Sequence, residues 1–73
     1  MIFMKNYFTV LINGDPFNCD SSMSLSDILR YLDIDLNNVV VEYNNDIINK
    51  LQFHSLFFNP NDSIEIISIV GGG

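Results

Sequence analysis

Hydrophobic and polar positions near the start of the chain predict two β-strands joined by a tight turn. Residues 7–12, YFTVLI, are aromatic, β-branched or aliphatic, which favours an extended strand. Asn13 and Gly14 follow, and both tolerate the positive φ angles of the two-residue turns that connect hairpin strands. The return strand contains Pro16, which has no N–H to donate to a neighbouring strand. The pattern therefore predicts a hairpin whose second strand lies at an edge of the sheet.

The spacing of hydrophobic residues becomes helical in the next segment, MSLSDILRYLDI. Four apolar residues recur at the i, i+3, i+4, i+7 spacing of one helix face: Leu25, Ile28, Leu29 and Leu32. Ser24 precedes them, and Asp27 three residues later completes a capping-box pattern with Asp in place of the usual Glu or Gln. We interpret the remaining positions as a solvent-exposed polar face, made of Ser26, Asp27, Arg30 and Asp33.

The second half of the chain predicts two long strands separated by an irregular segment. Residues 39–43, VVVEY, have the composition of a strand and are followed by the turn-forming sequence NND. Residues 47–58 show no sustained period, and we expect a short strand, a turn of helix and another short strand at 56–58. A turn of sequence NPND then leads into the last strand, SIEIISIV, at residues 63–70.

This order of elements predicts an α+β fold of the β-grasp (ubiquitin-like) type. Two strands, one helix and two or more further strands allow one main helix to cover one face of a mixed four- or five-stranded sheet. In a β-grasp fold the final strand lies in the middle of the sheet, which accounts for its many isoleucines. We expect one domain over residues 1–73, with residues 71–73 forming a flexible C-terminal glycine tail.

Alternation along the final strand predicts which of its residues are exposed. If Ile64 and Ile66 face the helix, then Ile67 and Ile69 lie on the opposite face, because successive side chains of a strand point to opposite sides. Together with Phe57 from the preceding segment, these two isoleucines form a candidate docking patch for a partner protein beside the glycine tail. The alternative is that they are scattered exposed residues of an isoleucine-rich chain.

Composition narrows the possible partners of the chain. Nine acidic and three basic residues give a net charge of -6, which opposes binding to nucleic acid or anionic membranes and favours a partner with a basic face. No apolar run approaches the roughly 20 residues that span a bilayer. Cys19 is the single cysteine and His54 the single histidine. Neither has the neighbours of a metal site or a catalytic triad, so we predict no catalytic residue, no bound metal and no bound cofactor.

The chain resembles the ThiS sulfur carriers of thiamine biosynthesis over almost its whole length. The resemblance includes LING in the hairpin, SLSDILRYLDI in the helix, VVVEYNNDII with Lys50 soon after, and NDSIEIISIVGGG at the end. The terminal glycines are the most specific part. Asn61 stands where such carriers commonly have Gly, and because Asn tolerates left-handed backbone we expect the turn to be kept.

The resemblance implies that the chain is a protein co-substrate and not an enzyme. The C-terminal carboxylate on Gly73 would be adenylated by a ThiF-type adenylyltransferase that uses ATP and Mg²⁺, and a persulfide sulfur donor would convert it to a thiocarboxylate. Thiazole synthase (ThiG) would accept the sulfur. Gly71 and Gly72, which lack Cβ atoms, would thread the tail into the partner active sites. The free carrier is expected to be a monomer.

Two other functions fit the same features. The small subunit of molybdopterin synthase shares the fold, the diglycine and the thiocarboxylate chemistry, whereas a ubiquitin-like modifier would join its terminal glycine to lysines of other proteins. We expect a cytoplasmic location, or the plastid stroma if the gene is plastid-encoded, since ten asparagines and ten isoleucines suggest A+T-rich codon usage.

Overall fold

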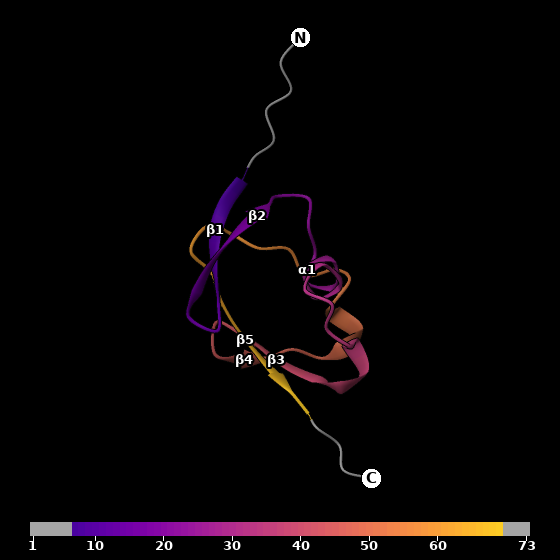
Figure 1. Ribbon diagram of the computed structural model, residues 1–73. Coiled ribbons are helices and arrows are strands. Elements are labelled where there is room, and N and C mark those ends of the chain that lie inside the picture. Colours follow the sequence, from indigo (N-terminus) through magenta and orange to yellow (C-terminus); the bar gives the residue numbers. More distant parts are fainter. Residues whose placement is uncertain (1–6, 70–73) are drawn as a thin grey trace.

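The computed structural model describes residues 7–69, which form one sheet and one main helix (Figure 1). The strands are β1 (Tyr7–Ile12), β2 (Asp15–Asp20), β3 (Val39–Tyr43), β4 (Asp46–Ile47) and β5 (Ser63–Ser68). The helix α1 (Leu25–Tyr31) follows the first hairpin. Two short 3-10 helices lie in the connections, η1 (Leu36–Asn38) and η2 (Lys50–Gln52).

The sheet is mixed and has the strand order β2-β1-β5-β3-β4. The final strand β5 lies between β1, to which it is parallel, and β3, to which it is antiparallel. Strand β2 lies at an edge, with Pro16 opposite Leu11. A five-stranded mixed sheet with one main helix on one face confirms the predicted β-grasp fold, and the predicted central position of the last strand is confirmed as well.

In residues 7–69, positive φ angles occur at four asparagines, at Asp33 and at Gly14. Asn13 has a φ of 51° and Gly14 a φ of 83°, as the predicted tight hairpin turn requires. Asn44 and Asn45, with φ angles of 48° and 75°, end β3. Asn61 has a φ of 70°, so it adopts the left-handed conformation that was expected at this turn. Asn reaches this region at lower cost than other residues with a Cβ atom.

The core lies between α1 and the face of the sheet that the helix covers. The fully buried side chains are Val10, Cys19, Leu25, Ile28, Leu29, Val41 and Ile64. Burial of each large aliphatic side chain contributes about 1.5–3 kcal/mol to folding. Leu32 is 37% exposed, because the helix ends at Tyr31 and Leu32 is already its C-terminal cap. The first two turns of the predicted helical stripe therefore supply the core contacts.

The helix begins at the predicted capping box. The Asp27 backbone N–H donates to Ser24 Oγ at 3.2 Å, and the Ser24 backbone N–H donates to Asp27 Oδ2 at 2.9 Å. This second hydrogen bond, helped by the Ser24 hydroxyl and by Arg30, outweighs partial desolvation and lowers the pKa of Asp27. A carboxylate whose pKa is lowered by folding stabilises the protein above its unfolded-state pKa, and that contribution disappears as the pH falls through the folded-state pKa.

Two predictions about the middle of the chain were wrong. Ser26 does not belong to an exposed polar face but is 95% buried, because its backbone N–H donates to the Phe53 carbonyl oxygen at 3.0 Å and the segment 53–56 covers it. The expected strand at 56–58 is reduced to a single bridge between Phe57 and Ser24. Both differences arise because this segment packs on the start of α1 and does not extend the sheet.

Candidate functional site

Strand β5 is the element that leads to the terminal glycines. Figure 1 shows β5 crossing the middle of the sheet and ending on the opposite side of the molecule from the start of β1. Residues 71–73, to which sequence analysis assigned the reactive tail, lie outside the described residues. The structure therefore describes the site as far as Ile69, and three groups of contacts fix the position of β5.

The first group holds the turn before β5 through the carboxylate of Asp62. The Tyr43 hydroxyl donates to Asp62 Oδ2, which also accepts the Asn59 backbone N–H at 2.7 Å. Asn44 Nδ2 donates to the other carboxylate oxygen at 3.3 Å. Burial, followed by the hydrogen bond to Asp62, raises the pKa of Tyr43. The phenol thus remains a protonated donor at neutral pH, and it joins the end of β3 to the start of β5.

The second group is a side-chain clamp formed by Asn13 on the middle of β5. Strand β1 ends at Ile12. The side-chain amide of Asn13 then makes the hydrogen bonds to β5 that the backbone of a further β1 residue would make. Asn13 Oδ1 accepts the Ile66 N–H at 2.6 Å, Asn13 Nδ2 donates to the Ile66 carbonyl oxygen at 3.1 Å, and the Asn13 backbone N–H donates to the Ile64 carbonyl oxygen at 2.9 Å. Sequence analysis assigned Asn13 only to the turn, because the two partners are 53 residues apart.

The third group pairs the end of β5 with β3 and with the residue before it. Ser68 lies opposite Val39, and the Ile69 N–H donates to the Asn38 carbonyl oxygen at 2.7 Å. Strand pairing therefore continues to Ile69, the last described residue. Val70 and the three glycines follow Ile69 in the sequence.

The exposure predicted for the last strand is observed. Ile64 is fully buried and Ile66 is 92% buried, whereas Ile67 is 51% exposed and Ile69 is 49% exposed. Phe57 is also exposed, at 52%, but its backbone is bridged to Ser24 at the start of α1. Ile67 lies opposite Val40 of β3, and the Ile69 N–H donates to the carbonyl oxygen of Asn38, the residue before β3. Phe57 and the two isoleucines are therefore held by contacts with different elements. The docking role of Phe57, Ile67 and Ile69 stays a prediction.

The described residues place no catalytic group beside the end of β5. His54 is exposed, and in residues 7–69 no three His, Cys, Asp or Glu side chains lie close enough to hold a metal ion. Cys19 is fully buried, and burial followed by the charge of Asp20 raises the pKa of its thiol. A raised pKa disfavours the thiolate that acts as a nucleophile.

A surface groove opens between β2 and α1, near the start of β1. Its lining is largely aromatic and aliphatic and includes Phe17 and Tyr31, whose rings meet edge to face at 5.8 Å. Asp20 is the one charged residue among those that line it. The lining contains no histidine, lysine or second carboxylate to pair with Asp20 as an acid–base couple. Over the described part of the chain, no helix is both long enough and apolar enough to cross a membrane.

Comparisons with known proteins find relatives that are similar to this chain over most of its length. The sequence is 43% identical over 65 residues to the uncharacterized protein ycf40 of Porphyra purpurea, covering 89% of this chain and 92% of the relative. It is 34% identical over 64 residues to thiazole synthase of Paramagnetospirillum magneticum, covering 88% of this chain but 20% of that protein.

A solved structure supports the same relationship. The crystal structure of the thiamine biosynthesis protein ThiS from Geobacter metallireducens superimposes with a TM-score of 0.75 at 25% identity, covering 90% of this chain and all of that one. The sequence profile of the ThiS family matches residues 10–73, which include the hairpin turn and the terminal glycines. The chain belongs to the ThiS family.

Proposed function

We propose that this chain is the sulfur carrier for formation of the thiazole moiety of thiamine. The observation that carries the proposal is a firmly paired central strand, β5, whose end is followed two residues later in the sequence by three glycines, in a member of the ThiS family. A rigid domain sets where the tail begins, and glycines without Cβ atoms let the tail enter a narrow active site. The chemistry is done by partner enzymes.

The proposed reaction takes place at the carboxylate of Gly73. A carboxylate oxygen attacks the α-phosphorus of ATP in a ThiF-type adenylyltransferase, and pyrophosphate leaves. The terminal sulfur of a persulfide then attacks the acyl carbon and displaces AMP. A thiol then attacks the donor's sulfur in this acyl disulfide, so that a disulfide forms on the donor and the thiocarboxylate is released on Gly73. ATP and Mg²⁺ are bound by the adenylyltransferase, whereas this chain supplies only the acyl group.

We further infer that thiazole synthase takes the sulfur from the carrier. About one fifth of the length of the Paramagnetospirillum magneticum thiazole synthase is similar to this chain, so that a carrier-like segment is part of a protein named for the synthase. We also infer that the gene is plastid-encoded and that the carrier acts in the stroma, since relatives in three organisms carry the plastid reading-frame name ycf40.

Intact-mass spectrometry tests this proposal directly. The purified chain is incubated with the adenylyltransferase, ATP, Mg²⁺ and a persulfide donor, and we expect replacement of one terminal oxygen by sulfur. Thiazole synthase is then added, and we expect the original mass to return as the sulfur is transferred. Removal of the sulfur only by a molybdopterin synthase large subunit would assign the chain to that pathway. A ladder of lysine conjugates would identify a protein modifier.

A second prediction concerns the two exposed isoleucines of β5. Ile67→Asp and Ile69→Asp are each expected to lower kcat/KM for adenylation at least about tenfold, because each places a charge at the centre of the proposed contact with the adenylyltransferase. Folding is expected to be retained, since both side chains are about half exposed.

Leu51→Asp provides the matched control for this measurement. Leu51 is 78% exposed and lies in η2, so the same aliphatic-to-acid change is made on a different element from β5. We expect Leu51→Asp to be adenylated at the wild-type rate. Equal kinetics for all three variants would show that Ile67 and Ile69 do not contact the adenylyltransferase.

A further inference from the structure

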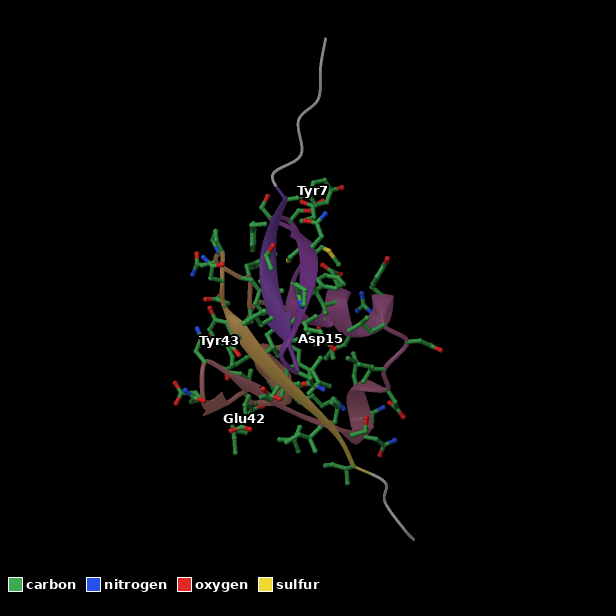
Figure 2. The ribbon with its side chains drawn as sticks, turned by 60° about the vertical axis from the view of Figure 1, so that its left-hand side comes forward. Tyr7, Asp15, Glu42 and Tyr43 are labelled. Carbon is green, nitrogen blue, oxygen red and sulfur yellow. The ribbon has the colours of Figure 1, made fainter. Side chains whose placement is uncertain are left out.

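The face of the sheet turned away from α1 carries an unusual pair of charges. Glu42 of β3 lies directly opposite Glu65 of β5 in the antiparallel register. Both face away from the core, because their neighbours Val41 and Ile66 are buried on the helix side. Figure 2 shows Glu42 on the side of the sheet away from α1. Side chains of directly opposite residues are about 4.5–5.5 Å apart at Cβ, so two carboxylates here repel each other.

Apolar side chains border this acidic pair on two sides of the same face. Ile47 lies opposite Glu42 on its other side, and the next outward row along the strands is Val40 opposite Ile67. Ile47 is 73% exposed and Ile67 is 51% exposed. We call this surface the open-face patch and define it by Val40, Glu42, Ile47, Glu65, Ile67 and Ile69.

The cations in the described part of the chain do not neutralise the two glutamates. Arg30 pairs with Asp27 on α1 at 3.6 Å, and Lys50 Nζ donates to Asn37 Oδ1. Opposite charges across two strands stabilise a sheet, and like charges destabilise it. The register therefore keeps an unfavourable pair beside exposed apolar side chains, where folding alone would favour a different pair.

We propose that Glu42 and Glu65 together bind one arginine of the protein that docks on the open-face patch. A guanidinium presents several N–H donors in a plane, so one arginine is able to donate to both carboxylates at once. It is also more weakly hydrated than an ammonium, which suits a site bordered by isoleucines. This inference rests on the proposed function, because it takes the adenylyltransferase as the partner.

Charge excludes the other classes of occupant. A second copy of the chain on the same face would bring two pairs of glutamates together, and each copy already carries a net charge of -6. Nucleic acid and anionic membranes would be repelled for the same reason. A protein with a cationic centre and an apolar surround is complementary in both respects.

The test compares two double variants with the same net charge. Glu42→Gln with Glu65→Gln removes the pair, whereas Asp15→Asn with Asp33→Asn removes two exposed carboxylates elsewhere. Affinity for the adenylyltransferase is measured by calorimetry at low and moderate ionic strength. We expect the glutamine variant to bind at least about tenfold more weakly, with a flatter salt dependence, and the asparagine variant to stay within about twofold of wild type.

Thermal unfolding and mass spectrometry on the same samples separate the possible outcomes. We expect the melting temperature of the glutamine variant to equal or exceed that of wild type, because the repulsion is gone. Wild-type affinity of that variant, together with normal thiocarboxylate formation, would overturn the arginine site alone. If the wild-type chain binds the adenylyltransferase but forms no adenylate, the proposed function is refuted. The salt dependence of binding then still tests the arginine site. If the wild-type chain does not bind the adenylyltransferase at all, both the arginine site and the proposed function are overturned.

Discussion

Deletion of Gly73 is expected to abolish adenylation and thiocarboxylate formation while leaving the fold unchanged. The shortened chain still ends in a carboxylate, but on Gly72, about 3.3–3.6 Å short of the proposed position. A misplacement of about 1 Å costs roughly 100-fold in rate, so we expect a loss of at least that size. Stability is expected to be unaffected because the described core and strand pairing are complete by Ile69.

Intact-mass spectrometry and thermal unfolding check the two halves of this prediction separately. Gly73→Ala is the informative companion, because it keeps the carboxylate at the same distance from β5 and adds only a methyl group. We expect it to be adenylated more slowly than wild type and faster than the deletion variant. Thiocarboxylate formation on Gly72 at the normal rate would show that the partner does not measure the length of the tail.

Features fixed by neighbouring residues were predictable from the sequence. The Asn13-Gly14 hairpin, the capping box at Ser24 and the burial of Ile64 each depend on periodicity or on backbone preferences within a few residues. The central place of β5 followed from the order of elements together with its apolar composition. Local patterns were sufficient because local preference and the global fold agree at these positions.

Features that depend on distant pairing were not predictable in the same way. Burial of Ser26 depends on the segment 53–56, which meets it only after the chain has crossed the sheet. The position of Phe57 beside Ser24 has the same origin. Glu42 and Glu65 are unremarkable until the register places them face to face. Since a slip of one residue would move every side chain to the other face, such pairs emerge only with the structure.

The largest effect on stability among our predictions is expected from Asn13→Gly. Glycine keeps the positive φ of 51° available, so the change removes the side-chain clamp on Ile66 without blocking the turn. Two hydrogen bonds are lost and the part-buried Ile66 N–H loses its acceptor. At about 1 kcal/mol for each bond, we expect the free energy of unfolding in urea to fall by about 2 kcal/mol.

Asn45→Gly is the control that separates the clamp from the turn. Asn45 also has a positive φ, 75°, and lies in a turn, but the side chain of this turn that accepts the Ser63 N–H of β5 is that of Asn44. We expect this variant to stay within about 0.5 kcal/mol of wild type. Hydrogen exchange adds a local measurement, in which the Ile66 amide is expected to exchange faster in Asn13→Gly alone. Equal destabilisation of both variants would mean that Asn13 acts only through its turn. A selective effect would mean that one side chain at the end of β1 holds the strand that precedes the terminal glycines.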